Sequence, residues 1–195
     1  GHEFRDDLRF FSEFELEHSL AGDDLPGEVE LEQAYIQYDY NETTQLTSGL
    51  FLMPIGIMNE THEPDTFYGV ERNTVEKNII PSTWWEAGVM LTKELKPGLT
   101  LDVALTSGLE ATASKYKPRD GRQKVASASA RSLATIGRLK YTAIPGLELA
   151  GSLFNQTDYC QGVVVGCGSA MAWETHAIYK KDKFQLRALY AGWNI

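Results

Sequence analysis

Residues 84–106 read Trp-Trp-Glu-Ala-Gly-Val-Met-Leu-Thr-Lys-Glu-Leu-Lys-Pro-Gly-Leu-Thr-Leu-Asp-Val-Ala-Leu-Thr, and this stretch decides the fold. From Leu99 to Leu105 every odd position carries a large aliphatic residue, and every even position carries a small or polar one. A period of two residues is typical of a β-strand with one apolar and one polar face. Pro97 and Gly98 are a tight-turn signal, because proline presets φ at the first central position and glycine accepts a positive φ at the second. The stretch therefore predicts a β-hairpin.

The hairpin pattern recurs twice further along the chain. Residues 141–149 read Tyr-Thr-Ala-Ile-Pro-Gly-Leu-Glu-Leu, with another Pro-Gly turn. Residues 179–187 read Tyr-Lys-Lys-Asp-Lys-Phe-Gln-Leu-Arg, with a charged turn in its place. One repeated hairpin design thus accounts for most of the C-terminal half.

Alternation of this kind predicts an all-β chain of about 9–10 antiparallel strands without a helix, nine of which show the pattern clearly. In the second strand the apolar residues move from odd to even positions, and a β-bulge near Glu32 and Gln33 would reconcile the two phases. The predicted strands cover residues 10–20, 28–38, 45–53, 82–92, 99–109, 130–143, 147–158, 170–179 and 184–193.

The connections between these strands alternate between short and long. Because successive antiparallel strands run in opposite directions, every second connection lies at the same end of the sheet. The Pro-Gly turns and the other short turns therefore share one end. The longer connections, residues 21–27, 54–81, 110–129 and 159–169, all fall at the other end. Short turns opposite long loops are typical of an up-and-down outer-membrane barrel. We expect residues 1–195 to form one such domain.

Composition agrees with this class and excludes others. The net charge of −9 argues against nucleic acid as a partner. No apolar run is long enough for a transmembrane helix, whereas barrel strands are short and half polar. The sequence shows no histidine pair at metal-ligand spacing, no glycine-rich phosphate loop, and no set of nucleophile, base and orienting group. We therefore expect no metal, no cofactor and no enzymatic activity.

The two cysteines, Cys160 and Cys167, flank a short Gln-Gly-Val-Val-Val-Gly segment. This spacing suits a disulfide that closes a small loop in an oxidising compartment, and two free thiols are the alternative.

Alternation does not by itself say which face points inward. A soluble barrel or sandwich that binds an apolar ligand would turn Leu101, Val103 and Leu105 inward, whereas a membrane barrel would turn them toward lipid. The heavily charged polar face favours the membrane barrel. So do the aromatic residues near strand ends, which resemble membrane girdles: Trp84, Trp85, Tyr141, Tyr179, Phe184, Tyr190 and Trp193.

Residues 28–110 carry a family resemblance. The runs Gln-Ala-Tyr-Ile-Gln-Tyr at residues 33–38 and Leu-Thr-Ser-Gly-Leu-Phe-Leu-Met-Pro-Ile-Gly at residues 46–56 resemble the phosphate-selective porin O/P-like family, as do residues 59–84. The resemblance implies a trimeric outer-membrane porin of about 16 strands, with a long loop folded into the lumen as a constriction. It makes residues 54–81 the candidate constriction loop.

The chain departs from that pattern in strand number and in its last residues. Nine strands cannot close in the usual antiparallel way, and Trp193-Asn194-Ile195 lacks the terminal aromatic residue that the family implies. We expect a partial chain with missing strands. A tenth strand from residues 2–9, or edges supplied by a second copy, are the alternatives.

Charged residues supply the candidate sites. His62, Glu63, Glu71 and Arg72 lie in the candidate constriction loop, where they either set the charge of the pore or hold the loop's shape through internal ion pairs. A second set lies on polar strand faces and is expected to point into the lumen: Glu13, Glu15, Glu17, Arg131, Arg138, Lys140 and Arg187. A solvated face is the alternative for the glutamates.

The sequence thus predicts an outer-membrane channel for passive diffusion of small hydrophilic solutes, expected to be charged, with anions such as phosphate among them. Its expected partners are outer-membrane lipid and lipopolysaccharide, the latter through the basic residues 115–124, and further copies in a trimer. A soluble barrel binding an apolar ligand and a barrel without an open pore are the competing functions.

Overall fold

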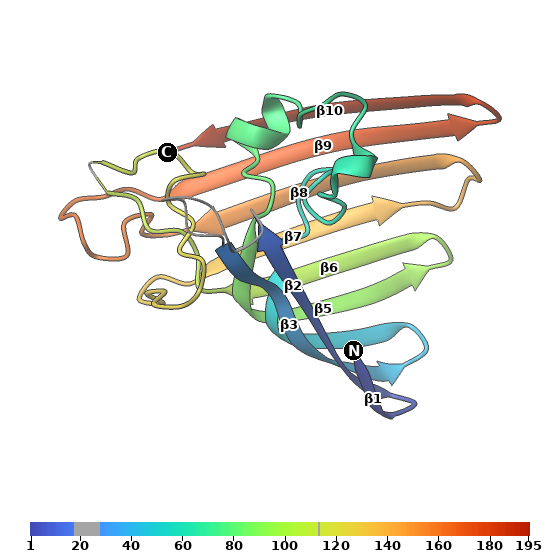
Figure 1. The fold of residues 1–195 in the computed structure, drawn as a ribbon, viewed down its shortest axis with the longest axis horizontal. Coiled ribbons are helices and arrows are strands. Elements are labelled where there is room, and N and C mark those ends of the chain that lie inside the picture. Colours follow the sequence, from blue (N-terminus) through green and yellow to red (C-terminus); the bar gives the residue numbers. More distant parts are fainter. Residues whose placement is uncertain (18–27, 113) are drawn as a thin grey trace.

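The computed structural model describes residues 1–17, 28–112 and 114–195. They form ten antiparallel strands in a single up-and-down sheet whose spatial order follows the sequence (Figure 1). The predicted all-β, antiparallel fold is confirmed. The strands are β1 (His2–Arg5), β2 (Leu8–Glu17), β3 (Glu28–Asn41), β4 (Thr44–Leu52), β5 (Trp85–Lys96), β6 (Leu99–Thr106), β7 (Ala134–Tyr141), β8 (Leu147–Gln156), β9 (Ala170–Lys181) and β10 (Phe184–Asn194).

The ten strands are the nine with a clear alternating pattern and the short strand β1, which pairs with β2. This is the tenth strand that residues 2–9 offered as an alternative. Within the described residues β1 pairs with β2 and β10 pairs with β9, and the sheet is not closed.

The predicted bulge in β3 is confirmed. Glu13 of β2 faces Gln33, and the next residue, Phe14, faces Leu31, so Glu32 has no partner in the register. The extra residue lets apolar side chains at odd positions before it and at even positions after it share one face of the sheet.

Short and long connections lie at opposite ends of the sheet, as predicted. Figure 1 shows short turns gathered at one end, with the loops 53–84, 107–133 and 157–169 at the other. Gly98, in the turn between β5 and β6, has a φ of +74° and lies against the next hairpin turn. A Cβ there would lie 2.6 Å from the backbone of Ala143, so both the conformation and the contact favour glycine. The connection between β2 and β3 lies outside the described residues.

The two faces of the sheet differ as a membrane barrel requires. On β6, Asp102 is 3% exposed and its neighbour Val103 is 46% exposed. The inner face, against which the 53–84 loop packs, combines polar and charged side chains with a buried apolar cluster, and large apolar side chains line the outer face. The outer face carries Phe14, Leu16, Val29, Leu31, Ile36, Leu46, Val89, Leu91, Val103, Leu105, Leu139, Leu149, Leu153 and Leu186. This sidedness does not favour a soluble barrel with an apolar interior.

An aromatic cluster occupies the inner face near the long-loop end. Trp84 and Phe154 are fully buried with ring centroids 5.1 Å apart, and Trp193 lies 5.6 Å from Phe154. The expectation that Trp84 and Trp193 belong to a membrane girdle is therefore wrong. These side chains pack inward, because the loop segments at this end cover them. Tyr179, Phe184 and Tyr190 are exposed.

Helical structure is confined to the 53–84 loop within the described residues. The loop contains a 3-10 turn, η1 (Pro64–Thr66), and a π-type turn, η2 (Val75–Ile79). In the part of the chain that the structure describes, no helix is long and apolar enough to cross a membrane.

Candidate channel wall and constriction loop

The 53–84 loop folds back over the inner face of the sheet instead of extending away from it (Figure 1). Its start is held by β8, where the Ser152 hydroxyl donates to the carbonyl of Pro54 at 3.1 Å. Its later part is held by β10, where Arg187 donates to the carbonyl of Thr66 at 3.0 Å and Trp193 donates to the carbonyl of Ile79 at 2.7 Å. The loop is therefore fixed over the inner face of the sheet, and its role as a constriction stays a prediction.

The loop has a polar internal frame. The carboxylate of Glu76, 2% exposed, accepts hydrogen bonds from the backbone N–H groups of Ile57 and Met58 at 2.7 and 2.6 Å. The side chain of Asn59 closes the neck by donating to the carbonyls of Met53 and Trp84 and accepting from the Trp84 N–H at 2.7 Å. These bonds satisfy backbone groups that would otherwise be buried without partners.

The loop tip is fixed to β7 by an ion-pair network. Arg138 is 6% exposed and donates from Nε to Asp102 of β6 at 2.8 Å. Its terminal nitrogens donate to Glu60 of the loop, from Nη2 at 3.2 Å. The guanidinium thus joins two strands of the wall to the tip.

A second contact fixes the tip to the bulge in β3. His62 Nε2 lies 2.8 Å from Glu32 Oε2, and His62 Nδ1 lies 3.2 Å from the carbonyl oxygen of Asn59. The hydrogen bond to Glu32 raises the pKa of His62 above its ordinary value, against the opposing effect of burial. Glu32 reaches this position because the bulge turns its side chain inward.

The other predicted loop residues divide into two groups. Arg72 donates to the carbonyl of His62 at 3.3 Å and lies over the Phe67 ring, so it supports the shape of the loop. Glu63 and Glu71 are exposed, and a hydrogen bond from Lys77 at 2.6 Å holds the pKa of Glu71 below its ordinary value. A role of Glu63 and Glu71 in setting the pore charge stays a prediction.

The predicted lumen-facing residues lie mostly on the inner face. Glu13 contacts Gln33 there, and Glu15 lies beside Glu30 and Glu32. Arg138, Lys140 and Arg187 also belong to this face. The side chain of Glu17 lies outside the described residues.

The placement of Arg131 on a strand face is wrong. This residue precedes β7, its side chain is exposed, and its guanidinium lies near Gly162 of the loop that contains the two cysteines. Alternation at residues 130–133 resembles a strand, but β7 begins at Ala134.

Two adjoining polar cavities follow the inner face. The first has a volume of ≈ 410 Å³, within the range of small-ligand sites, and lies between strands β3 to β7 and the loop tip.

 Its polar lining comes from Gln33, Gln37, Gln45, Thr47, Glu60, Thr92, Thr100, Asp102, Arg138 and Lys140. The second, of ≈ 670 Å³, lies at the short-turn end and shares Gln45, Thr92 and Thr100 with the first. Together they form a polar path along the wall.

The basic residues 115–124 are less peripheral than the sequence indicates. Arg119 and Arg122 point to the neck of the 53–84 loop, where Arg122 donates to the carbonyl of Thr83 at 2.7 Å. Burial lowers the pKa of Arg122 to about 10. Lys124 pairs with Glu30 of β3. Lys115 and Lys117 are exposed at the long-loop end.

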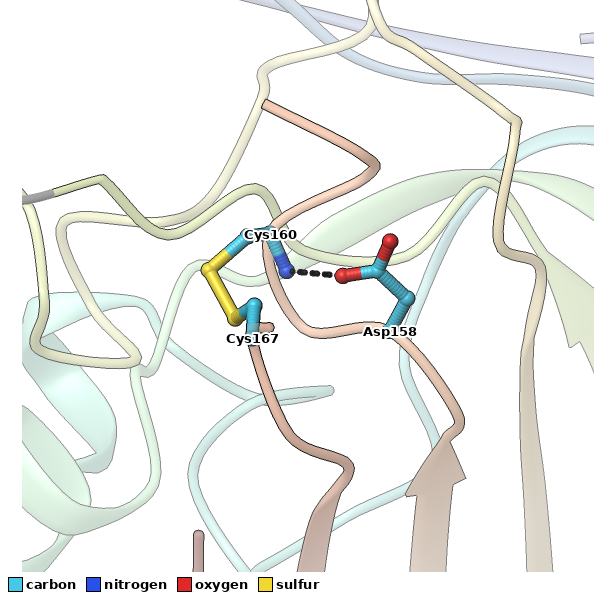
Figure 2. A group of neighbouring side chains, drawn as sticks. All are labelled: Asp158, Cys160 and Cys167. Carbon is cyan, nitrogen blue, oxygen red and sulfur yellow. Dashed lines mark hydrogen bonds between the residues drawn. A yellow bond between two sulfur atoms is a disulfide. The ribbon is translucent and has the colours of Figure 1, made fainter. Parts of the chain in front are cut away.

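Cys160 and Cys167 form a disulfide with a Cα–Cα distance of 5.9 Å. Figure 2 shows the carboxylate of Asp158 accepting a hydrogen bond from the backbone N–H of Cys160 at 3.0 Å. These three side chains are close enough to resemble a metal site, but the two sulfurs are bonded to each other.

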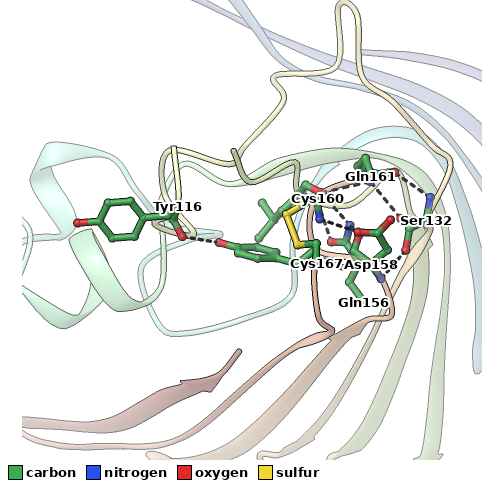
Figure 3. The surroundings of a disulfide bond; sticks show 9 residues. Tyr116, Ser132, Gln156, Asp158, Cys160, Gln161 and Cys167 are labelled. Atoms are coloured by element: carbon green, nitrogen blue, oxygen red, sulfur yellow. Dashed lines mark hydrogen bonds between the residues drawn. A yellow bond between two sulfur atoms is a disulfide. The ribbon is translucent and has the colours of Figure 1, made fainter. Parts of the chain in front are cut away.

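The surroundings of the disulfide tie this loop to its neighbours (Figure 3). Gln161, fully buried, donates to the carbonyls of Ser107 and Ser132 at 2.9 and 3.0 Å. The hydroxyl of Tyr159 donates to the carbonyl of Tyr116 at 3.3 Å, and burial raises the pKa of Tyr159. The segment before Cys167 is therefore anchored independently of the sulfur–sulfur bond.

Sequence reasoning missed Glu60 and Asp102 as site residues, and it placed Glu32 among the lumen glutamates without linking it to His62. Glu60 and Arg138 are 78 residues apart, and nothing in the local sequence pattern links them. The phase change in β3 was the available signal for Glu32, because a bulge re-aims the side chain at the extra position.

Comparison with known proteins supports the fold. No family model matches the chain. An uncharacterised protein of Aquifex aeolicus (strain VF5) is 34% identical over 159 residues, which cover 79% of this chain and 36% of that protein. The chain thus spans about a third of the length of this relative.

A solved structure shares the architecture. The high-pH structure of OprB from Pseudomonas putida, a porin, matches with a TM-score of 0.52 and 12% identity, over 85% of this chain and 46% of that chain. The class of fold is therefore that of the porin-like outer-membrane β-barrels. The phosphate-selective family itself rests on the resemblance of the motifs in residues 28–110.

Proposed function

We propose that this chain forms part of the wall and the constriction loop of an outer-membrane channel through which small hydrophilic solutes diffuse passively. One observation carries the proposal: apolar side chains cover the outer face while charged and amide side chains line the inner face, with the 53–84 loop fixed across it. A polar interior and a lipid-facing exterior are what a water-filled membrane barrel needs.

The solutes are proposed to be charged. Lys140 and Arg187 on the inner face, and the resemblance to phosphate-selective porins, support anions such as phosphate. The cavity at the short-turn end supports cations, because Asp6, Asp7, Asp39, Glu42 and Glu94 face it alongside Arg9. The reversal potential under a salt gradient decides between the two signs.

The outer-membrane location follows from the same reasoning. We propose lipid as the partner of the outer face, lipopolysaccharide phosphates as partners of the exposed Lys115 and Lys117, and a homotrimer as the assembly. The fold similarity supports a channel protein in place of an enzyme.

Planar-bilayer recording of the full-length protein tests the proposal. We expect stepwise ion conductance from folded protein, because the polar path runs along the inner face of the wall beside the loop. Folded protein that inserts without conductance steps would favour a barrel with no open pore. Native protein that stays monodisperse without detergent would favour the soluble ligand-binding barrel.

A further inference from the structure

A cavity between the 53–84 loop and β10 shares no lining residue with the polar path. Its volume is ≈ 360 Å³, within the range of small-ligand sites. Tyr68, which is 70% exposed, and the exposed residues Gly69 and Glu71 lie at its rim, so solutes reach it from solvent. The apolar part of its lining comes from Ile57, Met58, Phe67, Val75 and Leu189.

Arg187 supplies the positive charge of this cavity. From the inner face of β10 its Nη1 donates to the carbonyl of Thr66 at 3.0 Å, and its guanidinium carbon lies 4.8 Å from the centre of the Tyr68 ring. Arg9 and Arg138, on the same face of the sheet, pair with carboxylates, whereas Arg187 forms no ion pair with the described residues. The charge of Arg187 is therefore available to an anion.

The donors of Arg187 that lack partners lie on one edge of its guanidinium. Nε is buried without a hydrogen-bond partner, and Nη2 makes no hydrogen bond within the part of the chain that the structure describes. A buried donor without a partner is uncommon in native structures. A carboxylate that binds a guanidinium side-on takes Nε and one terminal nitrogen together. Because Nε is covered, such binding involves a small shift of the side chains around it.

The acidic residues of the cavity are already engaged by other groups. Glu76 is 2% exposed, and its carboxylate accepts from two backbone N–H groups of the loop and from the Asn73 amide at 2.8 Å. Glu71 accepts a hydrogen bond from Lys77 at 2.6 Å. Neither carboxylate neutralises Arg187, so a ligand can supply the missing counter-charge.

From this geometry we propose that the cavity binds a small aromatic carboxylate. The carboxylate of the ligand contacts Nη2 and Nε of Arg187, and its ring lies against Met58, Phe67 and Leu189. A ligand of this class matches the charge and the apolar lining together, whereas inorganic phosphate matches the charge alone. The site is an addition to the proposed channel, and binding there does not depend on conductance.

The test is equilibrium binding of 4-fluorobenzoate to the full-length protein in detergent, followed by the fluorine NMR signal of the probe. The titration is made at about pH 7.5, where a carboxylate is ionised. 4-Fluorobenzamide is the neutral comparison, and micelles without protein correct for partitioning. We expect saturable binding of the carboxylate, at least about tenfold tighter than that of the amide, because hydrogen bonds between charged groups are the stronger ones.

Three variants of the last hairpin separate a binding site from a structural contact. Arg187→Gln should remove the difference in affinity between the acid and the amide. Leu189→Ala should weaken both probes by a similar factor and keep that difference, because it removes only a contact with the ring. Lys183→Gln, which removes an exposed charge in the turn between β9 and β10, should bind both probes as the unmodified protein does.

Three results would overturn the proposal. The first is the absence of saturable 4-fluorobenzoate binding up to about 10 mM. The second is a preference for the acid that persists in Arg187→Gln, which would make Arg187 an anchor of the loop only, or one that Lys183→Gln abolishes equally. The third is displacement of the probe by inorganic phosphate as effectively as by unlabelled benzoate, which would indicate a site for any anion. Binding by protein that does not conduct in planar bilayers would support this site and contradict the channel.

Discussion

Arg138 is the residue on which the contact between loop and wall depends most. Its partner Asp102 is 3% exposed, so removing the guanidinium would leave a carboxylate buried without a counter-charge. We expect Arg138→Ala to lower the free energy of unfolding by about 3–5 kcal/mol, the usual cost of breaking a buried ion pair. Urea unfolding in lipid vesicles measures this change.

The matched control for that substitution is Arg131→Ala. Arg131 is exposed before β7 begins, so its loss should change stability by less than about 0.5 kcal/mol. Equal unfolding midpoints for the two variants would refute the role of Arg138. Combining Arg138→Ala with Asp102→Ala should restore part of the loss, because the unpaired charge is then gone.

Asn59 controls the neck of the 53–84 loop. Its buried amide makes three hydrogen bonds with Met53 and Trp84, which lie at the two ends of the loop. Asn59→Ala should cost about 1–3 kcal/mol through groups left unsatisfied, and should speed proteolysis within the loop. Asn78→Ala, at an exposed asparagine of the same loop, should leave the cleavage rate unchanged.

At the level of elements, the disulfide closes a loop that is already anchored. Gln161 holds the segment to neighbouring loops, while Val163, Val164 and Val165 are exposed. Reduction should therefore loosen residues 162–167 without unfolding the sheet, at a cost of at most roughly 3 kcal/mol on the chain-entropy model. Intact-mass analysis with alkylation checks the bond: no thiol should react before reduction and two should react afterwards. Two alkylated thiols without reductant would contradict the structure.

The sequence predicted the strands well because alternation is a local signal. The hairpin at Pro97 and Gly98 and the bulge at Glu32 both follow from the positions of apolar residues within a few residues of chain. β1 was expected only as an alternative, because His2–Arg5 is too short for a period to show. The boundaries of β7 were too wide because the alternation continues into the preceding loop.

Local sequence patterns did not predict the contacts between elements that lie far apart in the chain. Trp84 and Trp193 resemble girdle residues in sequence, and their inward packing depends on how the 53–84 loop folds. The contacts of this loop with Glu32 and Arg138 join residues far apart in the sequence and arise from the tertiary fold.

At the level of the whole molecule, the described strands leave β1 and β10 each paired on one side. Strand edges within a bilayer need partners, because lipid offers no hydrogen bonds to backbone groups. The chain covers 36% of its Aquifex relative and 46% of OprB, so channel activity is a property to measure on the full-length protein.

The most direct test of the central claim is the conductance of two cysteine variants on one strand before and after a charged, membrane-impermeant thiol reagent. Thr100 lines both polar cavities on the inner face, and Val103 lies on the outer face of the same strand. The account predicts that the reagent lowers the conductance of Thr100→Cys and leaves that of Val103→Cys unchanged. A conductance that falls in Val103→Cys while Thr100→Cys does not respond would contradict it.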